Sequence, residues 1–138
     1  MNRRAAALAG LLMLLAGASA ASGAAAARPT GGTVRLTIHY SRFDPGSIAV
    51  SPGETIRFVI INTDPIDHEF ILGDDRVQQV HEEGTEAYHP PRPGEVSVPA
   101  GSTVVTTYTF PAERTDLTFG CHLPGHYGFG MRGAITIA

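Results

Sequence analysis

The stretch "DLTFGCHLPGHYGFGMRGAITI", residues 116–137, holds the only cysteine of the 138-residue chain. Two short β-type segments flank a loop rich in glycine, with one proline, so the stretch predicts a strand, a loop and a second strand. Side chains alternate along a strand, which places Leu117, Phe119 and Cys121 on one face. If the two apolar residues face the core, Cys121 also points inward, at the end of its strand.

Similar short segments recur along the chain. "TVRLTIH" begins at Thr33 and alternates, with Val34, Leu36 and Ile38 on one face. "SIAVS", "ETIRFVIIN", "HEFIL", "EVSV" and "STVVTTYTF" follow, separated by turns with Pro, Gly and Asn. About eight candidate strands predict an all-β fold, a Greek-key antiparallel β-sandwich. Residues 73–93 break the pattern as a long polar excursion with room for a helical turn.

The N-terminus has the layout of a secretory signal peptide. "MNRR" precedes an apolar run that ends in small residues, which predicts a signal peptide over residues 1–20. Residues 21–32 are expected to form a flexible leader, and residues 33–138 the folded domain. An uncleaved membrane anchor is the alternative, although the run is mostly alanine and glycine. The predicted localisation is periplasmic or extracellular.

Composition limits the partners and the role of the cysteine. Removal of residues 1–20 leaves eight basic residues, all arginine, against thirteen acidic ones. An acidic domain without a basic stripe argues against a nucleic-acid partner. One cysteine cannot form an internal disulfide, so Cys121 is a buried inert thiol, a dimer-forming thiol or a thiolate held by a metal.

The neighbours of Cys121 favour the metal. His126 and Met131 lie in the loop that follows it, and His68 begins the segment "HEFIL" at another strand end. One thiolate, two imidazoles and a thioether form the ligand set of a mononuclear blue-copper site, whereas structural zinc sites usually lack methionine. His39 is the only serious upstream rival of His68, but it falls on the polar face of its strand.

On these residues, 33–138 resembles a cupredoxin, the plastocyanin/azurin-like blue-copper fold. The residues that carry the resemblance are "FDPGSIAVSPGETIRFVIIN", His68 in "DHEF", and "CHLPGHYGFGMRGAITI". The spacing Cys-x₄-His-x₄-Met is similar to that of rusticyanin-like members. The resemblance implies one copper ion that cycles between Cu(I) and Cu(II), with His68, Cys121, His126 and Met131 as its ligands.

The same resemblance implies a function. We expect an exported monomer that carries single electrons and is not an enzyme. Gly120 rather than a histidine precedes Cys121, so the bridge to a trinuclear copper centre is incomplete and oxidase activity is not expected. The alternatives are a periplasmic copper chaperone or buffer, and an accessory electron-donor domain for a copper oxidase or reductase.

Expected partners are redox proteins, such as a cytochrome or a copper oxidase or reductase, that dock transiently near His126. An apolar patch of Leu123, Pro124, Tyr127, Phe129, Pro65 and Ile66 is predicted there. The acidic segment from Asp74 to Glu86 is predicted to steer a basic partner. No membrane insertion is expected once the signal peptide is removed.

Three residue assignments have plainer alternatives. Met131 can simply pack in the core, because axial ligation is weak. His122 is expected on the outer face of its strand or beside the ligands rather than as a ligand. His81 and His89, with Glu82, Glu83 and Glu86, could form a second metal patch, although clustered charge is usually solvated surface.

Overall fold

The structure is a computed structural model that describes residues 25–84 and 90–138. The predicted signal peptide and the first part of the predicted leader lie outside these residues. Within the described ranges the chain forms nine strands and one helix. They are β1 (Thr33–Ile38), β2 (Phe43–Asp44), β3 (Ser47–Val50), β4 (Thr55–Asn62), β5 (His68–Gly73), α1 (Asp75–Gly84), β6 (Glu95–Val98), β7 (Thr103–Thr109), β8 (Leu117–Gly120) and β9 (Arg132–Ile137). The described residues contain no helix that is long and apolar enough to cross a membrane.

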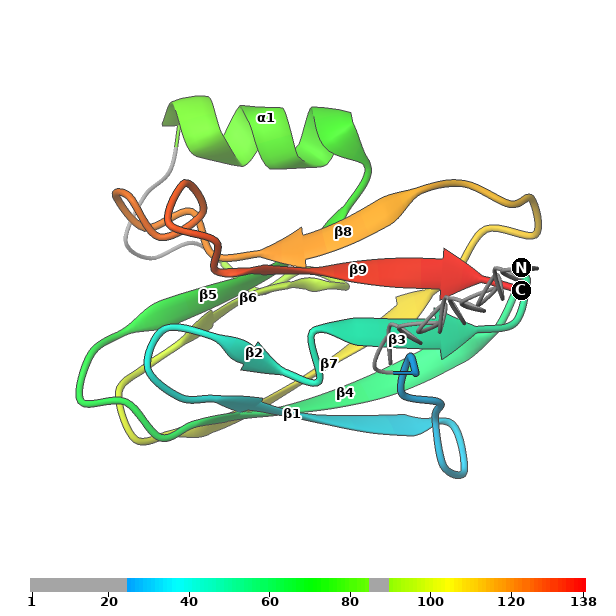
Figure 1. The fold of residues 1–138 in the computed structure, drawn as a ribbon, viewed down its shortest axis with the longest axis horizontal. Coiled ribbons are helices and arrows are strands. Elements are labelled where there is room, and N and C mark those ends of the chain that lie inside the picture. Colours follow the sequence, from blue (N-terminus) through cyan, green and yellow to red (C-terminus); the bar gives the residue numbers. More distant parts are fainter. Residues whose placement is uncertain (1–24, 85–89) are drawn as a thin grey trace, which may run out of the picture.

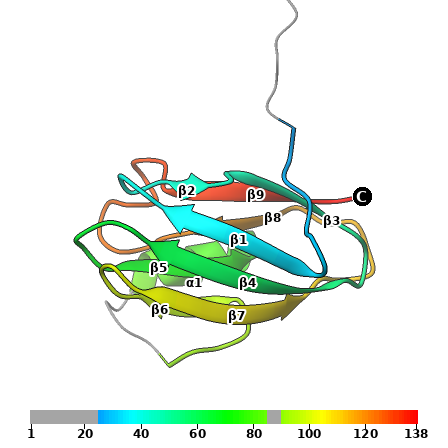
Figure 2. The same cartoon turned by 90° about the horizontal axis from the view of Figure 1, so that it is seen from below.

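The strands form two sheets that pack face to face (Figures 1 and 2). One sheet has the order β2-β1-β4-β7, and the other has the order β3-β9-β8-β5-β6. The inward faces of both sheets supply one continuous apolar core, which includes Leu36, Phe58, Phe70 and Phe119. Burial of these alternating apolar side chains is the main force that holds the two sheets together. The predicted β-sandwich is therefore confirmed, with nine described strands rather than about eight.

The pairing of the strands differs from the prediction in one respect. The sheets are mixed, because β1 pairs with β4 in parallel and β3 pairs with β9 in parallel, while the other pairs are antiparallel. Between β1 and β4 the chain crosses to the other sheet through β3, and it returns to the first sheet in the original direction. Alternation of side chains identifies a strand and its buried face, but it carries no information on strand direction.

Part of the predicted flexible leader is fixed to the domain. The N–H of Ala27 donates to Ser47 O at 2.9 Å, and Ala27 O accepts from the N–H of Ala49 at 2.8 Å. Ala27 thereby pairs in parallel with Ile48 and extends the sheet beyond β3. Backbone atoms of small residues make this pairing. The alternation of side chains in the sequence therefore does not predict it.

The helix α1 forms in the polar excursion after β5 and packs against the outer face of β5 and β8 (Figure 1). Asp74 provides its N-terminal cap, since a carboxylate oxygen accepts the N–H of Val77 at 3.0 Å. Its one buried residue is Gln78, a polar residue. Because the buried residue is polar, the sequence of α1 has no apolar helical period. The sequence predicts at most a helical turn in this segment.

Loops from both sheets meet at one end of the sandwich, on the left in Figure 1. These loops are the connection from β1 to β2, the connection from β4 to β5, and the loop between β8 and β9. The predicted metal ligands lie at this end. The C-terminus lies toward the other end.

Candidate metal centre

Three of the four predicted ligands come together at the loop end. His68 is the first residue of β5, Cys121 follows the last residue of β8, and His126 lies in the next loop. The Sγ atom of Cys121 lies 3.9 Å from Nδ1 of His68 and 3.3 Å from Nδ1 of His126. The three ligand atoms all lie within 4.8 Å of one another, a spacing suited to one metal ion.

The loop from Cys121 to Met131 is closed by its own backbone. The N–H of Cys121 donates to Met131 O at 3.1 Å, and the N–H of Met131 donates to His126 O at 2.9 Å. Met131 is fully buried and belongs to the core cluster that also contains Cys121. The backbone thus ties Met131 to two of the assembled residues, while ligation by its sulfur stays a prediction.

The thiol of Cys121 is fully buried. Burial raises its pKa to about 11, although hydrogen bonds from the backbone of Leu123 and Glu69 oppose that rise. The N–H of Glu69 points at Sγ from 3.3 Å. This donor would favour the thiolate once a metal ion replaces the proton, since a hydrogen bond to a charged form stabilises that form.

The ring of His68 is oriented by Asp64. Nε2 of His68 lies 2.9 Å from a carboxylate oxygen of Asp64, and both side chains are buried. A carboxylate only accepts, so Nε2 carries the hydrogen and Nδ1 presents a lone pair toward Cys121. Burial by itself raises the pKa of Asp64, but the N–H groups of Ser41 and Tyr40, together with His68, bring that pKa below its ordinary value.

His126 differs from the other two residues in its exposure. Its side chain is half-buried, whereas His68 and Cys121 are fully buried. Burial lowers the pKa of His126, and the neighbouring His68 lowers it further, so the neutral imidazole that a metal requires is favoured. The centroids of the two imidazole rings lie 5.1 Å apart.

His122 lies on the opposite side of the sheet from Cys121, under α1. Its Nδ1 lies 2.8 Å from a carboxylate oxygen of Glu82, and its Nε2 lies 2.8 Å from Oε1 of Gln78. Its ring stacks on Tyr127, with centroids 4.5 Å apart and an angle of 19° between the planes. Desolvation by burial lowers the pKa of His122, while Glu82 opposes that effect. As predicted, His122 lies outside the ligand group, on the outer face of the sheet, where it is buried.

The predicted second metal patch is only partly described. Nδ1 of His81 lies 2.9 Å from Val77 O, and Nε2 lies 3.3 Å from a carboxylate oxygen of Glu95. His89 and Glu86 lie outside the described residues, so that hypothesis stays a prediction. In residues 25–84 and 90–138, the only group of three such side chains spaced for a metal is His68, Cys121 and His126.

His39 is exposed and its Nδ1 lies 3.0 Å from the hydroxyl of Thr63. It is not part of the ligand group, and it follows the last residue of β1.

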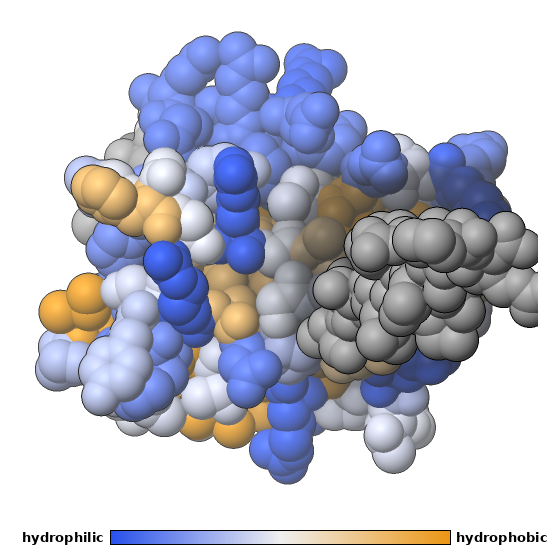
Figure 3. Space-filling model, in the orientation of Figure 1, coloured by the Kyte–Doolittle hydropathy of each residue, from blue (hydrophilic) through white to orange (hydrophobic). Residues whose placement is uncertain are grey.

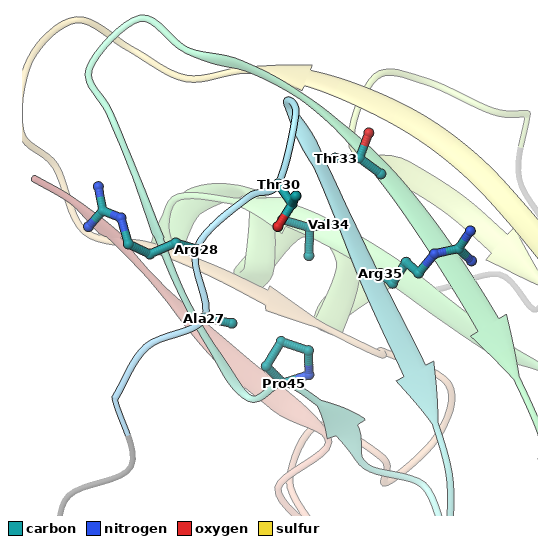
Figure 4. A pocket seen from close by; sticks show the side chains of 7 residues that line it. All are labelled: Ala27, Arg28, Thr30, Thr33, Val34, Arg35 and Pro45. Carbon is teal, nitrogen blue, oxygen red and sulfur yellow. The ribbon is translucent and has the colours of Figure 1, made fainter.

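A hollow of about 430 Å³ lies beside the leader, between Ala27 and β1. Its two charged side chains, Arg28 and Arg35, point away from each other on opposite sides of the hollow (Figure 4). Among the described residues that line the hollow there is no thiol, imidazole or carboxylate.

The assembled donors fit copper. One thiolate and two imidazole nitrogens suit a copper ion in either oxidation state, and a weak axial thioether is the usual fourth partner in such sites. His68, Cys121 and His126 would hold the ion, with Met131 beside them, and the bound ion would supply one-electron chemistry between Cu(I) and Cu(II).

Comparison with known proteins agrees with this arrangement. Residues 33–138 match the model of the family described as copper binding proteins, plastocyanin/azurin family. The chain belongs to this family, and its fold is the cupredoxin sandwich that the sequence resembles. Its bound metal is therefore copper.

Two named relatives and one solved structure are similar to the chain. The copper-resistant cuproprotein CopI of Rubrivivax gelatinosus is 36% identical over 109 residues, which cover 76% of this chain and 66% of that protein. The CopI of Pseudomonas aeruginosa is 30% identical over 128 residues, covering 69% of this chain and 70% of that protein. The chain thus spans just under two thirds of the Rubrivivax protein.

The solved structure is that of dithionite-reduced auracyanin from Roseiflexus castenholzii. It superposes with a TM-score of 0.65 at 24% identity, and the match covers 80% of this chain and 99% of auracyanin. This similarity supports the fold.

Sequence reasoning missed the residues that support the ligands. Asp64 lies in the turn "NTDPID", where the sequence singles out only Pro65 and Ile66, for the apolar patch. Asn62 holds that turn, because its amide donates to Ile66 O, Val98 O and Pro99 O, and its oxygen accepts the N–H of Asp64. The available signal was a carboxylate four residues before a candidate ligand histidine.

Proposed function

We propose that this protein carries single electrons between redox partners through one copper ion, which His68, Cys121 and His126 would hold with Met131 as a fourth, weaker ligand. The observation that carries the proposal is the spacing of the donors. Three donor atoms, from the start of β5 and from the segment after β8, lie within 4.8 Å of one another. A site that needs little rearrangement between oxidation states is what rapid electron exchange requires.

The exposure of the donors supports an exchange route through His126. His68 and Cys121 are enclosed, while the half-buried His126 is the donor nearest to solvent. Two large apolar side chains are exposed in the loops at this end of the molecule, Phe129 at 82% and Ile66 at 47%. Figure 3 shows hydrophobic atoms on this end of the molecule, over the loop between β8 and β9. A small apolar surface suits the brief encounters of electron transfer.

The outer surface of α1 supports a preference for basic partners. Asp74, Asp75, Glu82 and Glu83 are exposed there, with Arg76 as the opposing charge. This surface appears hydrophilic at the top of Figure 3. Such a charge distribution would accelerate the approach of a positively charged protein.

The test combines spectroscopy and kinetics on the copper-loaded protein. The absorption and EPR spectra should show a thiolate-to-copper band that disappears in Cys121→Ser, and voltammetry should show a reversible midpoint with fast self-exchange. An intense band with slow self-exchange and ready release of copper to a chelator would contradict electron carriage while leaving the copper site intact.

A second candidate function is copper resistance by binding or handing on copper. It is favoured by the relatives, which are named copper-resistant cuproproteins. Deletion of the gene in its host should then lower copper tolerance, and complementation with Cys121→Ser should fail to restore it. Restoration by a variant that binds copper but exchanges electrons slowly would favour copper handling over electron carriage.

We further propose that the protein is exported to the periplasm or the cell exterior, is not an enzyme and acts as a monomer. The proposal of export rests on the layout of residues 1–20. Mass spectrometry of the protein from a periplasmic fraction would identify its N-terminus, and sedimentation would give its oligomeric state.

A further inference from the structure

Two neighbouring residues in the connection from β1 to β2 adopt an uncommon backbone conformation. Tyr40 and Ser41 have φ angles of 50° and 52°, in the left-handed region that residues with a side chain rarely occupy. Two such residues in sequence persist only where surrounding contacts hold them. The connection presents the Tyr40 ring to solvent, with 82% of that residue exposed.

The contact that holds these residues is a single carboxylate. One oxygen of Asp64 accepts the N–H of Tyr40 and the other accepts the N–H of Ser41, both at 2.7 Å. These hydrogen bonds join two loops that are more than twenty residues apart in the sequence. Asp64 is 6% exposed, so water competes little for its oxygens.

The same carboxylate also meets the copper site. The oxygen that accepts the N–H of Ser41 lies 2.9 Å from Nε2 of His68. The position of Asp64 is in turn fixed, since its N–H donates to the side chain of the buried Asn62 at 2.9 Å. One side chain therefore joins a strained surface loop to the ring of a metal ligand.

We propose that Asp64 is a positioning residue that fixes the tautomer and orientation of the His68 ring for copper and, through the same carboxylate, holds the loop that displays Tyr40. The inference rests on the copper site of the proposed function and extends it to a residue outside the ligand set. A carboxylate behind a ligand imidazole fixes its orientation and raises its basicity. The more basic ring favours Cu(II) over Cu(I), because the ion of higher charge gains more from it.

The variant Asp64→Asn tests this role with almost no change in shape. An amide has one accepting oxygen and one donating nitrogen, whereas the present site needs acceptors toward Tyr40, Ser41 and His68. If the oxygen stays with Tyr40, the amide nitrogen faces His68 and requires Nε2 to accept. The hydrogen of the His68 ring then moves to Nδ1, the atom that faces Cys121.

The first measurement needs no copper. Nitrogen-15 NMR of the apoprotein should show the Nε2–H tautomer of His68 in the unmodified chain and a substantial Nδ1–H population in Asp64→Asn. Competition titrations with Cu(II) and Cu(I) should then show a loss of Cu(II) affinity of about 10- to 100-fold, with a smaller loss for Cu(I). The copper reduction potential accordingly shifts upward.

Two further variants separate positioning from simple stability. Ser41→Gly removes strain at a left-handed residue, so Asp64→Asn/Ser41→Gly should recover thermal stability but not the tautomer or the ratio of the two affinities. Asp67→Asn is the matched control. Asp67 is an exposed carboxylate next to His68 in sequence, and it accepts the N–H of Ala100 rather than contacting the ring.

The outcomes decide between the alternatives. The proposal is overturned if Asp64→Asn keeps both the Nε2–H tautomer and the affinity ratio, or if Ser41→Gly restores them together with stability. An equal effect of Asp67→Asn would also overturn it, since general electrostatics would then explain the result. If the unmodified protein bound no copper, the proposed function would fail, while the tautomer of the apoprotein would still report on Asp64.

Discussion

Copper binding to the apoprotein should release one proton from Cys121, even at pH 9. Burial raises the pKa of this thiol from an ordinary 9.0 to about 11, so only about one thiol in a hundred is ionised at that pH. The shift of roughly two units corresponds to about 3 kcal/mol of preference for the neutral thiol. A metal ion must displace this proton, because the thiolate is the ligand.

Calorimetric titration with Cu(I), repeated in buffers of different ionisation enthalpy, counts the released protons. We expect close to one proton per copper at pH 8 and again at pH 9, and none from this group in Cys121→Ser. His126 should contribute little, since its pKa is lowered and its ring is neutral at these pH values. Release of about half a proton at pH 9 would indicate a thiol with its ordinary pKa and would refute the argument from burial.

Four other outcomes are expected. Met131→Gln should retain the visible band but lower the reduction potential, because a harder oxygen donor favours Cu(II); an unchanged potential on voltammetry would leave Met131 as a packing residue. Asn62→Ala should lower the free energy of unfolding in denaturant by about 1–3 kcal/mol, since it leaves buried carbonyls unpaired. Gly133→Ala should also lower the free energy of unfolding by about 1–3 kcal/mol, because its Cβ would lie 2.2 Å from Cζ of Phe119. The control Gly84→Ala should be nearly neutral, because its Cβ would meet nothing within 4 Å. Association with a basic redox protein should slow as salt rises in stopped-flow experiments, because the carboxylates of α1 act over about 8–10 Å at physiological salt; a rate indifferent to salt would exclude α1 from partner docking.

The sequence predicted the sandwich and the residues that meet at its loop end, because both depend on local pattern. Alternation in β1 and β4 identified the buried face of each strand, and Cys121 shares the parity of Leu117 and Phe119, which the structure buries. The placement of His68 at a strand end followed from the same argument. The structure then assembled His68, Cys121 and His126 as a group.

The features that escaped prediction depend on contacts between distant polar residues. Helix α1 buries Gln78 through hydrogen bonds to the backbone of β5 and β8 and to His122, so its packing has no hydrophobic signature. The hydrogen bonds of Asp64 to Tyr40 and Ser41 likewise join loops that no periodicity relates. The parallel pairs depend on the path of the chain between the sheets, which alternation does not encode.

The strand β9 lies between β3 and β8, so it pairs with a neighbour from the early part of the chain and with one immediately before it. Because a chain is synthesised from its N-terminus, β3 is present long before β9 arrives to pair with it. Pairing between segments so far apart is slow, since the intervening chain must first be ordered. The loop that carries Cys121 and His126 lies between β8 and β9, so its two ends are held together by the pairing of these strands. A chain that lacked β9 would present the thiol and the imidazoles without the strand that closes their loop.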